Sequence, residues 1–232
     1  MKHTAWGIVI AAGKDEIMAG GVETPFLYLN DRPVLAYSLM AMQQCTEIEG
    51  VVVVIPAERA EGLLGMIKLF GFSKVRKIVG AKAKRGAFMA DALGHVDREA
   101  DAICVQEAAH PLATAELVGE TVKCARRQGN GIAAVPLPGA VLAGVKRNAA
   151  GTLAAGAGEG WMAVWPQSFR AETLRALYAD RTKPCGGAAD EVSALLARGE
   201  APRIVPVAGP SVRLCGMGDM ETALALVKAS AP

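Results

Sequence analysis

A segment near the start of the chain has the residues of a phosphate-binding turn. The apolar residues 7–10 lead directly into Ala11, Ala12, Gly13 and Lys14. Small residues let a backbone approach phosphate groups closely, and exposed N–H groups near a helix start would hold them. Ala-Ala-Gly after a strand is also common as a plain tight turn, and neither GxxxxGK[ST] nor GxGxxG opens a helix here. This pattern leaves nucleotide binding and a structural turn both open.

Two further loops carry charged or titratable groups at points where strands are expected to end. Glu107 and His110 follow the apolar residues 102–105, and Arg213 lies between the last expected strand and the last expected helix. A carboxylate at the carboxyl end of a strand can hold Mg²⁺ on the phosphates of a nucleotide, because this hard cation prefers oxygen ligands. His110 could be a ligand or an acid–base group, or else a solvated loop histidine. Arg213 could reach a phosphate, or else lie at the surface.

Short apolar segments alternate with segments of helical periodicity along the first 135 residues. Strands are expected over 6–10, 50–55, 74–79, 102–105 and 131–135, and helices over 33–45, 58–70, 85–95 and 115–128. The apolar runs are continuous rather than alternating, which is typical of strands that helices cover on both faces. Five such units predict one α/β domain with a doubly wound, mostly parallel sheet. Ligands bind such sheets beyond the carboxyl ends of the strands, where the three loops described above should meet.

The pattern changes between residues 136 and 160, which are rich in Gly, Ala and Pro. A weak hairpin is expected there, with strands over 141–146 and 152–155 and a turn between them. Such an excursion within an α/β domain is typical of an arm or lid, often used for dimer contacts, and it predicts a protruding β-arm. The segments expected after the arm are a strand over 161–165, helices over 168–178 and 190–197, a strand over 203–207, and a last helix over 219–229 with Asp219 as its N-cap.

The bulk composition excludes several classes of protein. The 232 residues are 52% apolar and 21% charged, which argues against disorder, and the longest apolar runs are far shorter than the roughly 20 residues of a membrane span. A formal net charge of +2, with acids and bases mixed along the chain, argues against a nucleic-acid partner. The five cysteines are far apart and form no zinc-binding pattern, so buried thiols in a reducing compartment are expected. Because the chain enters a strand almost at once, we expect a cytoplasmic protein without a signal peptide.

Taken in order, several segments resemble the 2-C-methyl-D-erythritol 4-phosphate cytidylyltransferase family. Residues 8–14 are similar to the first strand and loop of that family. Residues 80–93, which begin with Gly80 and contain Arg85, resemble its Gly-rich, Arg-containing segment. The similarity extends over nearly the whole chain, and the colinear order of the matches makes it specific.

Two more segments carry the resemblance further along the chain. Residues 105–112 around Glu107 and His110 are similar to the motif His-Asp-Ala-Ala-Arg-Pro of the family. Residues 189–195 around Asp190 look like its Thr-Asp-Glu-Ala-Ser segment. The glutamate keeps a carboxylate where the family has Asp, whereas His110 stands where the family has Arg.

The resemblance implies a reaction and a set of residues that perform it. The family joins CTP to a sugar-alcohol phosphate and releases pyrophosphate, in the non-mevalonate isoprenoid pathway; the phosphate attacks in line while cations neutralise the developing charge. It implies Lys14 and Arg213 as catalytic cations, and Glu107 as the ligand of Mg²⁺. The nucleotide-binding residues that it implies are Ala11, Ala12, Gly13, Gly80, Arg85, Glu107, His110 and Asp190. It also implies a homodimer built through the arm at about 136–160, with CTP or another nucleotide and a small phosphorylated polyol as ligands.

The sequence departs from the family in the first loop. Ile17 stands where the family has Arg and Thr24 where it has Lys, while Asp15, Glu16 and Glu23 add negative charge. Losing one charge-assisted contact to a ligand typically costs about 2–4 kcal/mol. Three functions therefore stay open: an active cytidylyltransferase, a related nucleotidyltransferase with a different phosphorylated substrate, or a degenerate homologue kept for nucleotide or partner binding.

Overall fold

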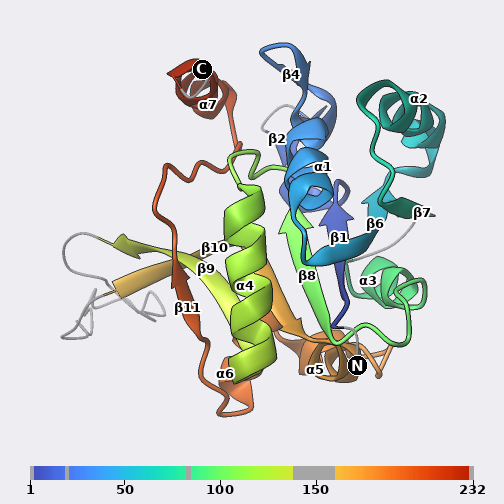
Figure 1. Cartoon of the computed structure of the whole chain (residues 1–232), viewed down its shortest axis with the longest axis vertical. Helices are drawn as coiled ribbons and strands as arrows, with labels where there is room; N and C mark the ends of the chain where they lie inside the picture. Colours follow the sequence, from blue (N-terminus) through green and yellow to red (C-terminus); the bar gives the residue numbers. More distant parts are fainter. Residues whose placement is uncertain (1–2, 19–20, 82–84, 138–159, 230–232) are drawn as a thin grey trace, which may run out of the picture.

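The computed structural model describes residues 3–18, 21–81, 85–137 and 160–229, and a seven-stranded sheet runs through it (Figure 1). The strand order is β11-β9-β10-β8-β1-β6-β7. The bounds of these strands are β1 (Ala5–Ile10), β6 (Ile48–Ile55), β7 (Val75–Gly80), β8 (Ala102–Glu107), β9 (Asn130–Leu137), β10 (Gly160–Arg170) and β11 (Ile204–Pro206). Two short hairpins, β2 (Ile17–Met18) with β3 (Val22–Glu23) and β4 (Tyr28–Leu29) with β5 (Arg32–Pro33), follow the first strand.

The strands from β8 to β7 run parallel, which brings their carboxyl ends to one edge of the sheet. Ile8 of β1 lies opposite Val52 of β6 and Val105 of β8, and β6 pairs in parallel with β7. The strand β10 is antiparallel to both of its neighbours, β8 and β9. The predicted doubly wound, mostly parallel α/β fold is confirmed.

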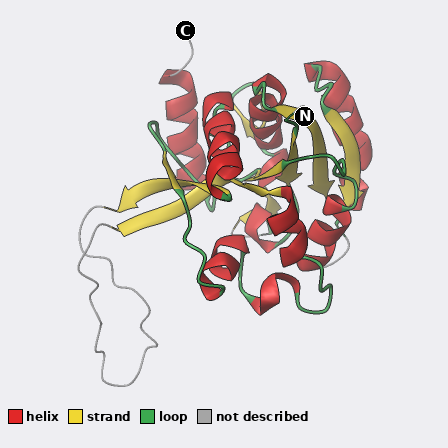
Figure 2. Ribbon diagram, turned by 60° about the horizontal axis from the view of Figure 1, so that its bottom comes forward, coloured by secondary structure: helices red, strands yellow, loops and turns green. Residues whose placement is uncertain are grey.

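Helices cover both faces of the sheet (Figures 1 and 2). Their bounds are α1 (Val34–Gln44), α2 (Ala60–Phe70), α3 (Arg85–Leu93), α4 (Ala115–Gln128), α5 (Ala171–Leu177), α6 (Glu191–Ala197) and α7 (Met217–Ala229), with short 3₁₀ turns at Lys14–Glu16, Thr24–Phe26, Ala57–Arg59 and Pro184–Gly187.

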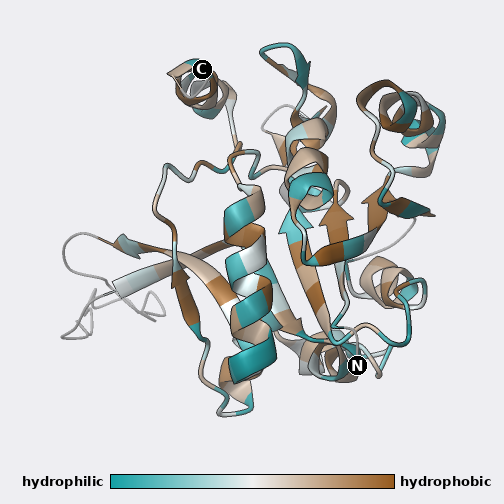
Figure 3. Cartoon of the chain, viewed as in Figure 1, coloured by the Kyte–Doolittle hydropathy of each residue, from teal (hydrophilic) through white to brown (hydrophobic). Residues whose placement is uncertain are grey.

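Successive strand residues face opposite helix layers, as the alternation of side chains along a strand requires. Ile8 and Ile10 are buried in a core cluster with residues of α3, α5 and α6, whereas Val9 between them is buried with residues of α1, α2 and α4. Figure 3 shows the consequence in the hydropathy pattern: the parallel strands are largely apolar, and α4 turns its hydrophilic side outward. Continuous apolar strands arise because both faces are covered.

The structure corrects two boundaries near the second half of the chain. A helix was expected from residue 168, but β10 continues to Arg170, because Ser168 and the buried Phe169 still pair with β8. The last helix begins at Met217, not after a cap at Asp219. Asp219 lies within the first turn, where its carboxylate accepts the N–H groups of Cys215 and Gly216, both at 2.9 Å.

The strands β9 and β10 form an antiparallel pair that projects from the body of the molecule (Figure 2). Their register places Gly160 opposite Leu137 at the far end of the pair. These residues are the two ends of the predicted arm, and the expected hairpin over 141–155 lies outside the described residues. Within the parts of the chain that the structure describes, no helix has both the length and the apolar character needed to cross a membrane.

Candidate functional site

A cavity of about 600 Å³ opens where β8 and β10 meet the loops at their edge of the sheet. Five residues singled out by the sequence lie around it: Arg85, Glu107, His110, Asp190 and Arg213. They come from α3, the end of β8, the loop after β8, the start of α6 and the segment before α7. The fold therefore brings together segments that are more than 100 residues apart.

Arg85 is the central charged group of this cavity. One guanidinium nitrogen, Nη1, donates to Glu107 Oε1 at 2.8 Å, and the other, Nη2, lies 3.3 Å from both carboxylate oxygens of Glu191. The guanidinium also lies 5.4 Å from the ring centroid of Trp165. Burial would lower the pKa of Arg85, but the attraction of Glu191 and Glu107 outweighs it and raises the pKa above its usual value. Arg85 is therefore a permanent cation whose charge two carboxylates already share.

A tyrosine extends this network away from the cavity. The hydroxyl of Tyr178 donates to Glu191 Oε1 at 2.7 Å, and Glu191 is fully buried. Burial and the neighbouring Glu191 carboxylate raise the pKa of Tyr178, which keeps its hydroxyl protonated. The chain of contacts Tyr178–Glu191–Arg85–Glu107 thus links α5, α6, α3 and β8.

His110 is buried and neutral in this environment. Its peptide N–H donates to the carbonyl of Glu107 at 3.1 Å, and its own carbonyl accepts the side-chain amide of Gln106 at 2.9 Å. Burial, and then the positive charge of Arg213, lower the pKa of His110 to about 3. Its buried Nδ1 has no hydrogen-bond partner among the described residues. At neutral pH this imidazole therefore adds no positive charge at the position where the family resemblance places Arg.

Glu16 brings a carboxyl group from the first loop into the same region. Its Oε2 accepts the peptide N–H of Ala109 at 2.9 Å, whereas its Oε1 is buried without a partner in the described part of the chain. Burial, and then the negative charge of Glu107, raise the pKa of Glu16 well above its ordinary value. The opposing influences of Arg213 and Arg85 show that Glu16 lies within reach of their field. This buried acid was not predicted as a site residue.

The small-residue turn after β1 lies beside the cavity without lining it. Ala11 and Ala12 are buried, and the peptide N–H of Ala11 is already bonded to the carbonyl of Val54 at 2.8 Å. Gly13 has a φ of 105°, which favours glycine, and a side chain there would meet the ring of Phe88. Lys14 begins a 3₁₀ turn and is exposed. Among the backbone N–H groups of the predicted phosphate-binding turn, that of Ala11 is therefore used within the sheet and is not directed at a ligand.

The two positions where the family has cations differ in their surroundings. Ile17 is 47% exposed in the β2–β3 hairpin, whereas Thr24 is fully buried and its hydroxyl has no partner among the described residues. The nearby Glu23 accepts from Arg59 Nε at 2.8 Å, and that guanidinium lies over the ring of Phe26. The acid at position 23 is therefore compensated, which the sequence did not show.

The remaining predicted site residues are Asp190, Arg213 and Gly80, and they have different surroundings. Asp190 caps α6, because its carboxylate accepts the N–H of Ser193 at 2.7 Å. Arg213 is exposed at the cavity, and the next residue, Leu214, donates its N–H to the carbonyl of Ala109 at 2.8 Å. Gly80 ends β7 at the same edge of the sheet, but three strands away from β8, and does not line the cavity.

Several residues that shape the cavity were not found by sequence reasoning. Trp165 and Gln167 of β10 line it, and Glu191, which does not line it, forms an ion pair with Arg85. The sequence signal for Glu191 was its place directly after Asp190 in the segment resembling Thr-Asp-Glu-Ala-Ser. Gln167 lies in the segment 166–169, which is similar to a segment of the family beside the arm, but no role at the site was predicted for it. Trp165 carried no such signal, because β10 enters the sheet between β8 and β9 and that insertion cannot be inferred from periodicity.

The fold is that of the nucleotidyltransferases. A solved structure of 4-diphosphocytidyl-2C-methyl-D-erythritol synthase from Anaerococcus prevotii superposes with a TM-score of 0.83 at 16% identity, over 97% of this chain and 96% of that one. The family model for 2-C-methyl-D-erythritol 4-phosphate cytidylyltransferase (IspD) matches residues 6–229. The chain therefore belongs to this family, as the resemblance predicted.

Curated relatives agree with this assignment. A 2-C-methyl-D-erythritol 4-phosphate cytidylyltransferase from Geobacter metallireducens is 28% identical over 98% of this chain and 99% of its own length. The bifunctional enzyme IspD/IspF from Anaeromyxobacter dehalogenans is 31% identical over 96% of this chain. The alignment covers 57% of that bifunctional relative, so the chain spans a little over half its length.

Proposed function

We propose that this chain transfers a cytidylyl group from CTP to a small phosphorylated sugar alcohol and releases pyrophosphate. The observation that carries the proposal is the cavity where Arg85, Glu107, His110, Asp190 and Arg213 meet, in a chain that matches the cytidylyltransferase family over residues 6–229. In this reaction the phosphate of the sugar alcohol attacks the α-phosphorus in line, and the protein contributes positioning and cations.

The charge available to phosphate oxygens comes mainly from Arg213 and Lys14, which are both exposed. The lining of the cavity carries two positive side chains, Arg85 and Arg213, and two negative ones, Glu107 and Asp190, while His110 is neutral. The charges of the lining therefore balance. A triphosphate needs a surplus of positive charge to bind. We therefore assign the surplus to Lys14 in the loop after β1 and to a divalent cation that accompanies the nucleotide.

Glu107 is the residue that we propose as the protein ligand of this Mg²⁺. Mg²⁺ on nucleotides is usually held by one or two carboxylates together with phosphate oxygens, so a single carboxylate is sufficient. Glu16 places a second carboxyl group in the neighbourhood, but its pKa is raised by burial and by Glu107, so Glu107 remains the carboxylate that we assign to the ion. Among the described residues no group of three or more acidic, histidine or cysteine side chains is arranged to hold an ion. A single carboxylate, Glu107, fits a cation that arrives bound to the phosphates of CTP and would link them to the cavity.

A second candidate function is binding of a nucleotide or partner without turnover. Three observations favour it: Ile17 is an exposed apolar residue, Thr24 is fully buried, and Glu16 places an acid in the loop. Each removes or opposes a cation in the loop after β1.

Two measurements decide between these functions. Pyrophosphate release is followed with CTP, Mg²⁺ and 2-C-methyl-D-erythritol 4-phosphate, and binding of Mg-CTP is followed by calorimetry. Transfer predicts release that falls at least a hundredfold in Glu107→Gln, while Glu172→Gln on the exposed side of α5 releases at the normal rate. Binding of Mg-CTP without release above a protein-free blank supports the second function and contradicts the first.

We further propose that the chain is one domain that acts as a homodimer in the cytoplasm. The dimer proposal rests on the family resemblance and on the projecting β9–β10 pair. The location is supported by the cysteines, which are all free thiols: Cys45, Cys104, Cys124 and Cys185 are buried. Cys215 is exposed, contrary to the expectation that all five would be buried.

A further inference from the structure

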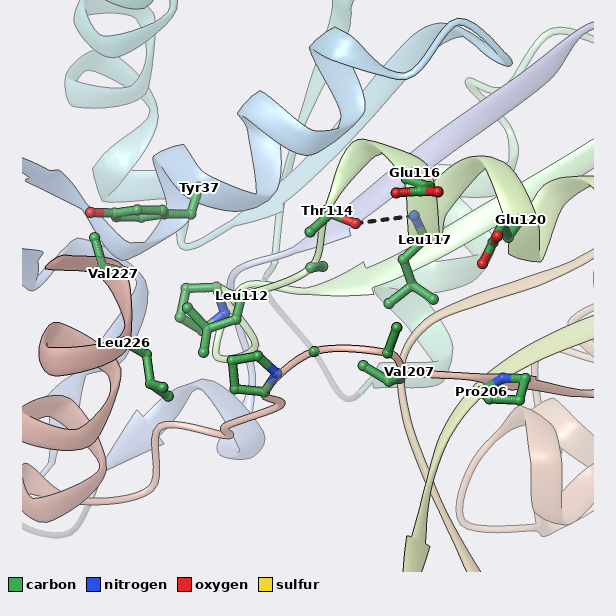
Figure 4. Close-up of a pocket in the computed structure, with 15 residues that line it drawn as sticks. Tyr37, Leu112, Thr114, Glu116, Leu117, Glu120, Pro206, Val207, Leu226 and Val227 are labelled. Atoms are coloured by element: carbon green, nitrogen blue, oxygen red, sulfur yellow. Dashed lines mark hydrogen bonds between the residues drawn. The ribbon is translucent and has the colours of Figure 1, made fainter. Parts of the chain in front are cut away.

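A second cavity, of about 430 Å³, lies between α1, α4, α7 and the segment after β11 (Figure 4). Its volume falls within the range of small-molecule sites in proteins. In Figure 4 the side chains of Leu117 and Val207 approach one another from α4 and from the end of β11, while Leu226 and Val227 line the side formed by α7. Tyr37 of α1 closes the wall beside α7. Most of this surface is apolar.

The only charged side chains on the lining of this cavity are two carboxylates. Glu116 and Glu120 lie one turn apart on α4 and are both exposed. Neither forms an ion pair within the described part of the chain, and every residue that lines the cavity is described. An apolar pocket with negative charge at its rim is complementary to a molecule with an apolar body and a positive head group.

Only a thin wall separates this cavity from the nucleotidyltransferase cavity. A small crevice of about 10 Å³ lies between them and is lined by residues of both. Leu112, Leu117 and Val207 belong to the second cavity, whereas His110 and Trp165 belong to the first. Since protein interiors transmit displacement through close packing, filling one cavity presses on the wall of the other.

The backbone makes the same connection. Pro111 lines the second cavity directly after His110, and Pro210 lines it directly before Ser211 of the first cavity. The two segments are joined by the hydrogen bond from Leu214 N–H to the carbonyl of Ala109. A ligand held between α4, α7 and these segments would therefore fix the loop that carries His110 and the segment that carries Arg213.

We propose that the cavity between α1, α4 and α7 binds a small amphipathic organic cation, an amine on an apolar body, and that its occupancy orders the two segments that carry His110 and Arg213. The apolar body lies against Leu117, Val207 and Leu226, and the ammonium lies beside Glu116 and Glu120. This site is separate from the transfer reaction and does not require the chain to be catalytically active.

Binding is tested with three probes of similar size and the same apolar body: 3-phenylpropylamine, 3-phenylpropanol and 3-phenylpropanoate. Calorimetry should show saturable binding of the amine, about tenfold tighter than the alcohol and tighter still than the carboxylate, because two rim carboxylates together contribute on the order of a factor of ten. The double variant Glu116→Gln/Glu120→Gln should lose this tenfold preference and keep the affinity for the alcohol. Glu61→Gln, at an exposed position on α2, is the matched control and should bind all three as the unmodified protein does.

Location and coupling need two further measurements. Ala208→Trp fills the cavity from an exposed lining position and should abolish binding of the amine without unfolding the protein. Hydrogen exchange in peptides covering 107–114 and 206–214 should slow when the amine is bound, and not in Ala208→Trp. Equal binding of the three probes, no binding at all, binding that survives Ala208→Trp, or binding without slower exchange would each overturn the proposal.

Discussion

Glu16 buries a carboxyl group in the loop where this family resemblance places phosphate-binding cations. One of its oxygens holds the peptide N–H of Ala109, so the residue ties the loop after β1 to the loop after β8. The other oxygen is buried without a partner in the described residues, and the pKa is raised by burial and by Glu107. A side chain in this position stabilises the loop best when it carries a proton.

The raised pKa of Glu16 predicts how the stability of the protein changes with pH. With a raised pKa in the folded state, the unfolded chain loses the Glu16 proton first, so stability present at low pH is lost as the pH rises through the folded pKa. Glu16→Gln keeps the acceptor for Ala109 and does not titrate. We expect the variant to gain about 1–3 kcal/mol over the unmodified protein at pH 8, and much less at pH 5.

Melting temperatures at pH 5 and pH 8 measure this difference. His110, whose pKa is lowered to about 3, acts in the opposite sense, because acid below its ordinary pKa favours the unfolded chain. That effect is the same in both proteins and cancels in the comparison. Glu172→Gln, at an exposed site, serves as the control. Parallel pH profiles for Glu16→Gln and the unmodified protein would refute the assignment.

The two missing cations of the first loop are predicted to respond differently to restoration. Ile17→Arg adds a guanidinium at a position that is 47% exposed, so the fold should tolerate it with a change below about 0.5 kcal/mol. Thr24→Lys places an ammonium where the present side chain is fully buried, which costs several kcal/mol unless the loop opens. Ile17→Arg should therefore strengthen Mg-CTP binding about tenfold or more, and Thr24→Lys should mainly lower the melting temperature. Calorimetry and thermal melts on both variants provide the comparison, and equal melting temperatures would contradict it.

At the scale of secondary-structure elements, a buried ionic network fixes how α3, α5 and α6 meet the sheet. Arg85 opens α3 and bonds to Glu107 at the end of β8, while Glu191 opens α6 and accepts the hydroxyl of Tyr178 just beyond α5. Breaking a buried pair on one side typically costs about 3–5 kcal/mol, because a charge is left uncompensated.

This network gives a ranked prediction for stability. Glu191→Gln should destabilise by about 3–5 kcal/mol, because it removes the fully buried one of the two carboxylates that share the charge of Arg85. Tyr178→Phe should cost less, about 1–3 kcal/mol, since it removes only the donor to Glu191. Tyr28→Phe, at a side chain that is 69% exposed, should change stability by less than about 0.5 kcal/mol. Urea unfolding gives the three values, and a Tyr178→Phe cost above that of Glu191→Gln would show that the network is held together differently.

Hydrophobic periodicity predicted where the helices and strands lie in the sequence better than it predicted which strands pair in the sheet. The helix over 115–128 and the strand over 102–105 could be placed because their apolar residues repeat with the helix period or run continuously. The end of β10 could not, since residues 168–170 are strand because they pair with β8 and, at Ser168 and Phe169, also with β9. Glu107 could be expected near a ligand site because it ends a parallel strand, and it lines the cavity in the structure.

The missed part of the site depends on burial and distance, which a sequence does not display. Glu16 and Glu23 were both counted as repulsive acids on the loop, yet Glu23 pairs with Arg59 and Glu16 is buried against Ala109. Arg85 was interpreted as a nucleotide-binding residue, but its charge is shared between two carboxylates. Charge counting along a chain therefore describes a site poorly until partners are known.

At the scale of the whole molecule, the projecting β9–β10 pair sets the surface available for a second copy. The antiparallel register continues to Leu137 and Gly160, well beyond the part of β10 that pairs with β8. Residues of this outer part include Met162, which is 48% exposed. An exposed apolar side chain on a projecting ribbon is suited to burial against a partner.

The proposed homodimer can be tested without disturbing the body of the molecule. Because Leu137 and Gly160 are paired across the ribbon, an Asn-Gly turn in place of residues 138–159 would close the hairpin in its natural register. We expect light scattering after gel filtration to show a dimer for the unmodified chain and a monomer for the shortened one, with melting temperatures that stay close. A Gly/Ser linker of the original length, in place of the same residues, separates the effect of their sequence from that of their length. If the shortened chain elutes as a dimer at the same concentration, the interface lies elsewhere, because the segment proposed to form it has been removed.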